Sequence, residues 1–218
     1  MSCKFIETLE SRQLLSASVF NATVAADRLA VRADLLQFRA DFLSADATLL
    51  SDRTALKNDN VKAATTVVPL IKKLHTDAKT MGTQLLQDRL TERSNVLKDE
   101  SVIVGDLVQI LKDRGNATAV AADKTKLKAD RVALQNDMIA GINTRLATRQ
   151  AAHDQLVADG AAILTAAQTD PNASAQLKTD LTNWVNSFDS KLNTAQTDLT
   201  NLANARTKLA NDLAASNV

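Results

Sequence analysis

The scarcity of helix-breaking residues is the feature that most limits what this chain can fold into. Only five glycines and two prolines occur in 218 residues, and these are the residues least compatible with a helix interior. The apolar residues are mostly Ala, Leu and Val, whereas aromatic residues make up 3% and tyrosine is absent. Strands favour aromatic and β-branched residues, so the composition predicts an all-α fold.

Three similar tripeptides precede long periodic segments and mark where helices are expected to begin. They are Asn21-Ala22-Thr23, Asn116-Ala117-Thr118 and Asn172-Ala173-Ser174. Asparagine is among the best N-cap residues because its side-chain oxygen accepts a hydrogen bond from a free N–H of the first turn. The triplets also match the acceptor pattern for N-glycosylation, but capping explains their position better. Gly115 suits the left-handed conformation that often ends a helix.

The remaining boundary falls between Asn60 and Thr66. Thr65-Thr66 can cap the next helix, and Pro69 is tolerated in a first turn but not further inside. The resulting prediction is an elongated, coiled-coil-like, antiparallel up-down four-helix bundle. Its helices are expected near residues 20–60, 66–114, 117–168 and 172–215. A break near Ser101 is left open, because Val102-Ile103-Val104-Gly105 follows it.

Apolar residues recur every three or four positions in these segments, which is the spacing of a helix with one buried face. In the last segment the stripe is Leu177, Leu181, Trp184, Phe188, Leu192, Ala195, Leu199, Leu202, Arg206, Leu209 and Leu213. In the third it is Leu127, Leu134, Met138, Ile142, Leu146, Leu156 and Ile163. The first segment has two adjacent rows, Leu35, Phe42, Leu49, Leu56 and Leu29, Leu36, Leu43, Leu50. Two rows predict a broad face that contacts more than one helix.

Aspartates recur at seven-residue intervals, which keeps them on one face of a helix. The series are Asp27, Asp34, Asp41, then Asp99, Asp106, Asp113, and then Asp123, Asp130, Asp137. Either they form a carboxylate ladder that binds divalent cations, or they lie on the solvated face of the helices. Interspersed Lys and Arg favour the solvated face. Asp130 and Asp198 are therefore expected to face water beside the core residues Leu134 and Leu199.

The two histidines are the only further candidates for a metal site. His75 and His153 lie at similar distances from the turn at Gly115, so a hairpin would place them at nearly the same height. Together with Asp77 or Asp154 they could hold Zn²⁺ or Cu²⁺. Height does not fix direction around the helix, so unrelated structural or surface roles are the favoured interpretation, and no metal or other cofactor is predicted.

The sequence lacks the residues that several other chemistries require. Cys3 is the only cysteine, so the remainder of the chain has no thiol for catalysis or a disulfide. A serine-nucleophile elbow and a Gly-rich phosphate loop are both missing. A net charge of +1 without Lys/Arg clusters argues against nucleic acid as a partner. No stretch reaches the roughly 18 apolar residues of a membrane span. A non-catalytic protein is expected.

The N-terminal segment differs from the body of the chain. Its key residues are Leu9, Glu10, Arg12, Leu14, Leu15, Ser16 and Ala17. This run resembles the LEPR-XLL motif found at the N-terminus of many planctomycete surface and exported proteins, although Ser11 stands where that motif usually has proline. The resemblance implies an extracytoplasmic, bacterial location and nothing about activity. We therefore expect a sorting-like segment at 1–18 and a helical domain at 19–218.

Besides the minor alternative of a metal-binding bundle at His75 and His153, two functions remain for a bundle of this kind. The first is a structural, spacer or interaction role, with a protein partner or self-association. The second is binding to a lipid surface through amphipathic helices. The Thr-, Asn- and Asp-rich polar faces favour the first.

Overall fold

The computed structural model describes residues 22–59 and 61–216, which form four long helices. The helices are α2 (Ala22–Asn58), α3 (Val67–Lys112), α4 (Ala117–Thr169) and α5 (Ala175–Ala215), with a short 3₁₀ helix η1 (Val61–Ala63) before α3. The 53 residues of α4 make a rod about 80 Å long at 1.5 Å per residue. The described residues contain no strand, which confirms the predicted all-α class.

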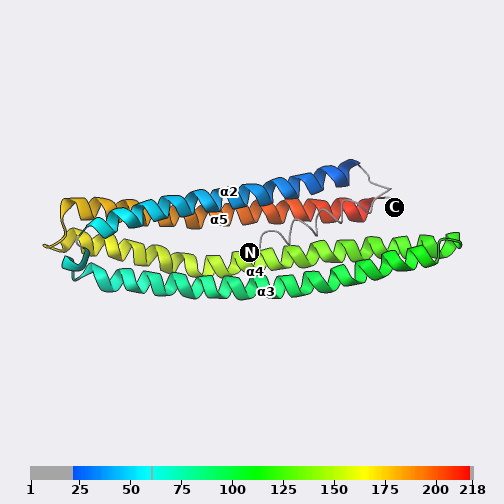
Figure 1. The fold of residues 1–218 in the computed structure, drawn as a ribbon, viewed down its shortest axis with the longest axis horizontal. Helices are drawn as coiled ribbons and strands as arrows, with labels where there is room; N and C mark the ends of the chain where they lie inside the picture. The colour runs from blue at the N-terminus through cyan, green and yellow to red at the C-terminus, as the bar shows by residue number, and fades with distance from the viewer. Residues whose placement is uncertain (1–21, 60, 217–218) are drawn as a thin grey trace.

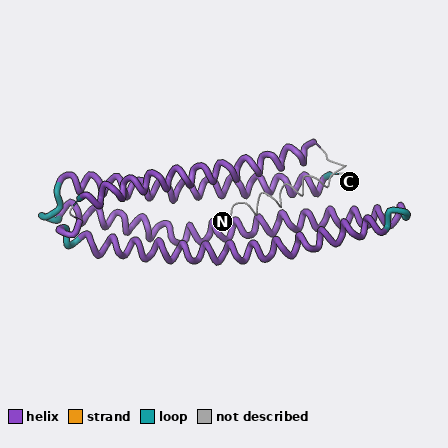
Figure 2. The backbone as a smooth tube through the Cα atoms, in the orientation of Figure 1, coloured by secondary structure: helices purple, strands orange, loops and turns teal. Residues whose placement is uncertain are grey.

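The helices run up and down in an elongated antiparallel bundle, as predicted (Figure 1). Packing pairs α2 with α5, α5 with α4, and α4 with α3. The α2–α3 and α4–α5 turns lie at one end and the α3–α4 turn at the other (Figure 2). The outer helices α2 and α3 do not pack against each other along their lengths. Each of them is therefore supported mainly from one side.

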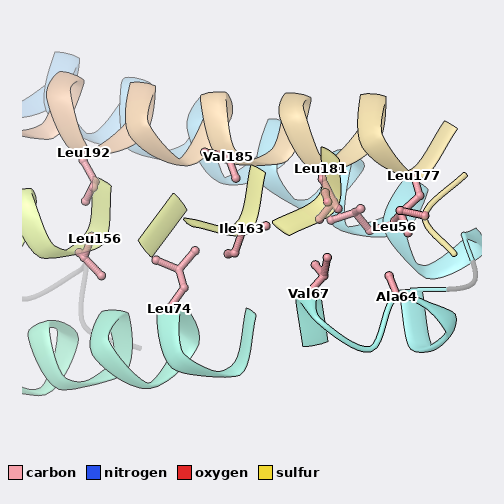
Figure 3. Packing of buried hydrophobic residues seen from close by; sticks show 12 residues of the cluster. Leu56, Ala64, Val67, Leu74, Leu156, Ile163, Leu177, Leu181, Val185 and Leu192 are labelled. Carbon is pink, nitrogen blue, oxygen red and sulfur yellow. The ribbon is translucent and has the colours of Figure 1, made fainter. Parts of the chain in front are cut away.

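The core divides into three clusters along the bundle. The largest lies at the end with two turns and unites all four helices, including Leu56, Leu74, Ile163 and Leu181 (Figure 3). A second cluster joins α2, α4 and α5, and a third joins only α3 and α4. The bundle is thus fully assembled at one end. Further along, α3 is held by α4 alone.

The stripes predicted for the last two helices are confirmed. Every member of the α5 stripe is buried except Trp184 and Phe188, which are half-buried. Leu134 and Leu199 are 1% and 3% exposed. α3 continues through Ser101 without a break, and Ile103 just beyond it is buried against α4.

The helix starts agree with the sequence in one case and differ in another. Asn116 caps α4 as predicted, because its side chain accepts from the Ala119 N–H at 3.2 Å. The prediction that Asn172 caps α5 is wrong: Ser174 is the cap, and its hydroxyl accepts from the Leu177 N–H at 3.0 Å. The Asn172 N–H donates instead to the Asp170 carboxylate at 2.8 Å, so Asn172 belongs to the preceding turn. Asn21 lies outside the described residues.

The turn predictions at Gly115 and Thr66 also need correction. Gly115 does not have a positive φ, because α3 ends through ordinary turn hydrogen bonds such as Asn116 N–H to the Asp113 carbonyl at 2.7 Å. Thr66 precedes α3 but makes no side-chain cap. Its hydroxyl donates to Asp170 at 2.6 Å, which ties the α2–α3 turn to the α4–α5 turn. Pro69 lies in the first turn of α3, as predicted.

The caps give a first testable difference. Ser174→Ala should lower the free energy of unfolding by about 0.5–2 kcal/mol, the usual cost of removing an N-cap side chain. Asn172→Ala, two residues away, should change it by less than about 0.5 kcal/mol. Urea melts of the two variants measure the contrast. An equal loss for both would mean that α5 starts earlier than Ala175.

Candidate interaction surface

The second leucine row of α2 lies on the outside of the molecule. Leu29, Leu36, Leu43 and Leu50 are 63%, 52%, 69% and 65% exposed. Exposed alanines alternate with them at Ala26, Ala33, Ala40 and Ala47. We call this seven-residue repeat of Leu and Ala the α2 leucine face. A contiguous apolar strip of this kind is uncommon on the surface of a monomeric protein, which makes it a candidate contact site.

The prediction that both leucine rows of the first helix contact other helices is therefore wrong for the outer one. Each outer leucine directly follows or closely neighbours an inner apolar residue, as in Leu35-Leu36 and Leu49-Leu50. α2 packs mainly on α5 along its length, and one partner helix can cover only one of two adjacent rows. The other row stays in solvent.

α3 carries a similar but interrupted outer row. Its exposed apolar residues are Leu86, Leu90, Leu97, Val104, Val108 and Leu111. Arg93 and Glu100 occupy positions of the same outer stripe, so charge breaks the apolar strip twice. α2 and α3 are the outermost helices of the bundle (Figure 1), and the two outer rows do not cover each other.

The aspartates that repeat every seven residues are not on a solvated face, contrary to prediction. Asp27 and Asp106 are buried, and the other seven members of the three series are half-buried. Asp198, also expected to face water, is 9% exposed. These side chains line the seams between paired helices, where the antiparallel partner brings a second aspartate opposite.

Facing aspartates form pairs with a constant register. Between α3 and α4 the facing carboxyls are Asp99 with Asp137, Asp106 with Asp130, Asp113 with Asp123, and Asp77 with Asp159. On α5, Asp212 faces Asp27 of α2, and Asp180 faces Asp59 in the turn that follows α2. Each step forward on one helix is matched by an equal step back on the other, as antiparallel packing requires.

A sequence signal for these seams exists and was missed. A Lys or Gln precedes a large apolar residue, and an Asp follows four positions after the Lys or Gln. Lys73, Lys126 and Lys208 each bind their own Asp at i+4 and also the Asp across the seam. Gln84, Gln109, Gln155 and Gln176 donate to their own Asp in the same way. The i to i+4 spacing lets these side chains meet on the helix surface.

Each of the six pairs has one buried carboxylate oxygen that accepts no hydrogen bond. These buried oxygens belong to Asp27, Asp59, Asp99, Asp106, Asp123 and Asp159, one for each pair. Burial raises the pKa of Asp59, Asp99 and Asp123, and the facing carboxyl raises each of them further. Two carboxyls in contact are accommodated when one of them holds a proton that it donates to the other.

These shifts predict how stability depends on pH. A raised pKa means that the folded chain binds protons more tightly, so stability should rise as the pH falls from 7 towards the ordinary value of 3.8. The pKa of Asp170 is lowered by its hydrogen bonds to Thr66 and Asn172, so its contribution is lost below about that pH. We expect maximal stability in mildly acidic solution.

Aspartate-to-asparagine variants test the direction of this pH dependence in urea melts at pH 7 and pH 4.5. Asp99→Asn should stabilise the protein at pH 7 by about 0.2–0.5 kcal/mol, the size of a like-charge pair, and should reduce the gain on acidification. Asp170→Asn is the opposite control and should destabilise at pH 7. A gain at pH 4.5 that is unchanged in Asp99→Asn would contradict the paired carboxyls as its source.

The two histidines do not come together. His75 is exposed, whereas His153 is half-buried and contacts Asp154 and Asn193 at 3.2 Å each. The register of the Asp77–Asp159 pair places Ala161 level with His75, eight residues from His153, or about 12 Å along α4. Within residues 22–59 and 61–216 no three His, Cys, Asp or Glu side chains are grouped to hold a metal ion.

Comparisons with family models, curated proteins and solved structures found no match. None of the described helices has a segment long and apolar enough to cross a membrane.

Proposed function

We propose that this protein is a non-catalytic helical bundle with a structural or protein-interaction role outside the cytoplasm. The α2 leucine face is the observation that carries the interaction role. Four leucines between 52% and 69% exposed repeat every seven residues along one helix, which is the pattern by which a helix receives a second helix. The buried seams hold the helices in place and leave this face outward.

Site-specific photocrosslinking in cells tests the interaction role. A photoreactive amino acid at Leu36 or Leu43 should crosslink to a protein that mass spectrometry identifies, because these side chains point to solvent in the single chain. Asn201, an exposed polar position on α5, is the control and should crosslink far less. Equal or absent crosslinking at all three positions would contradict an interaction role for this face.

A lipid-surface role is the alternative, and the structure supplies one observation in its favour. The residues along one flank of the α2 leucine face are Arg32, Arg39 and Arg53, with the single aspartate Asp46 among them. Arginines beside an apolar strip are typical of helices that bind anionic lipid. Sedimentation with anionic vesicles tests this role: binding that Leu36→Gln and Leu43→Gln together abolish would favour it over the protein partner.

The extracytoplasmic location rests on the LEPR-XLL resemblance, whose residues lie outside the described part of the chain. A reporter fused after Phe20 should leave the cytoplasm in a planctomycete-type host, and Arg12→Ala or Leu14→Asp should retain it. Fractionation of the cells measures the outcome. A reporter that remains cytoplasmic with the intact segment would remove this part of the proposal.

A further inference from the structure

We propose that the partner of the α2 leucine face is the same face of a second copy of this chain, with the two α2 helices parallel. This inference rests on the proposed interaction role and names its partner. Three properties of the face support it: the completeness of its repeat, the residues on its two flanks, and the length over which it can make contact.

The repeat on α2 is that of a complete coiled-coil seam. Leucines at 29, 36, 43 and 50 alternate with alanines at 26, 33, 40 and 47, and all of them are exposed. Leucine and alanine at alternating three- and four-residue steps let one helix insert its leucines between side chains of another. The outer row of α3 lacks this continuity because Arg93 and Glu100 interrupt it. α2 is therefore the better site for a second helix.

The flanks of the face distinguish the parallel from the antiparallel arrangement. On a helical projection, Arg32, Arg39, Asp46 and Arg53 follow one flank, and Asp46 is already paired with Lys191. The other flank carries Ala30, Gln37, Ser44 and Ser51. Two antiparallel copies would bring these two flanks, each with three arginines and one aspartate, against each other, and their net positive charges repel. Two parallel copies place each arginine flank against the uncharged flank of the other copy.

The size of the face indicates a weak dimer. The seam from Ala26 to Thr54 is about 42 Å long and one helix diameter, about 11 Å, wide. Two copies would bury about 900 Å² in total, below the 1,200–2,000 Å² typical of stable complexes. The dimer should therefore form in a concentration-dependent equilibrium. Twofold pairing of one face with itself closes the assembly at two copies.

Sedimentation equilibrium of the full chain at 5–200 µM tests the proposal. The wild type should rise from the 23.4 kDa monomer towards twice that mass. Leu36→Gln with Leu43→Gln should weaken dimerisation at least about tenfold, while circular dichroism and the urea midpoint stay unchanged because both side chains are exposed. Leu90→Gln with Leu97→Gln, on the outer row of α3, is the matched control and should dimerise like the wild type.

Disulfide trapping tests the orientation. In a Cys3→Ser background, Leu43→Cys should form a disulfide between two copies, since a parallel pair places the same seam position of both helices side by side. The exposed Asn201→Cys on α5 should not.

The possible outcomes separate this inference from the proposed function. A chain that stays monomeric at 200 µM overturns the proposal that the partner is a second copy. An equal loss of dimerisation in the α2 and α3 variants overturns it too, and so does binding to anionic vesicles in place of dimerisation. If photocrosslinking at Leu36 then captures a different protein, the interaction role still stands. Dimerisation without trapping at Leu43→Cys overturns the parallel arrangement.

Discussion

Leu134→Ala is expected to lower the free energy of unfolding by about 2–5 kcal/mol, as large-to-small substitutions in a packed core do. Leu134 is 1% exposed and lies in the cluster that joins α3 to α4. Truncation removes its burial and leaves a cavity in the seam between the two helices. Leu199→Ala, at 3% exposed between α2, α4 and α5, should cost a similar amount.

Leu43→Ala is the matched control for these variants. Leu43 is 69% exposed, and alanine is at least as good a helix former as leucine. Its replacement should change stability by less than about 0.5 kcal/mol in solution too dilute for the proposed dimer to form. Urea melts monitored by circular dichroism compare the three variants. A cost at Leu43 equal to that at Leu134 would mean that the outer row is covered within one chain.

The contrast between these leucines also shows how far the sequence predicts the fold. The heptad stripes of α4 and α5 identified their buried faces because these helices lie in the middle of the bundle, where each packs against two others. For α2 the same pattern gave two equally apolar rows. Which row is buried depends on how many helices pack against α2, and this is a property of the whole bundle that no local repeat contains.

The prediction that the aspartates face water is wrong for a different reason. The usual expectation that carboxylates face water holds for isolated charges, but here Lys73, Lys126 and Lys208 lie one turn before their aspartates and reach across the seam. The recurring Lys or Gln four residues before Asp was visible in the sequence. Its partner across the seam was not, because the pairing depends on the register between two helices. The same register separates His75 from His153.

Glu92→Met is expected to lower the free energy of unfolding by about 3 kcal/mol, and it is the second large effect. The Glu92 carboxylate on α3 pairs with Arg145 on α4 at 2.7 Å, and the two side chains are only 16% and 13% exposed. Gly141 of α4 leaves the space that Glu92 occupies, since a Cβ there would lie 2.8 Å from the Glu92 Cβ. Removing one partner of a buried ion pair strands the other charge, at a cost of about 3–5 kcal/mol when both are fully buried.

Arg145→Met should cost less than Glu92→Met, about 2 kcal/mol, which is below the range for a fully buried pair. The reason lies in the charges around the pair. Glu92 also feels the positive charges of Arg206 and Arg89, so it keeps favourable partners when Arg145 is removed. Arg145 has the positive charge of Arg89 nearby as well as the negative charge of Asp88, so the loss of Glu92 leaves it one repulsive and one attractive neighbour, whereas Glu92 without Arg145 keeps two attractive ones.

The double variant Glu92→Met with Arg145→Met separates loss of the pair from loss of packing. Because it leaves neither member of the pair unpaired and keeps apolar volume in the seam, it should be more stable than Glu92→Met alone. Asp154→Asn is the surface control, with a side chain 88% exposed beside His153, and should change stability by less than about 0.5 kcal/mol. If Glu92→Met and Arg145→Met lower the free energy of unfolding equally, and the double variant loses the sum of the two, the two side chains contribute independently. The ion pair would then not be what joins α3 to α4 at this level, and the leucine clusters alone would hold the seam.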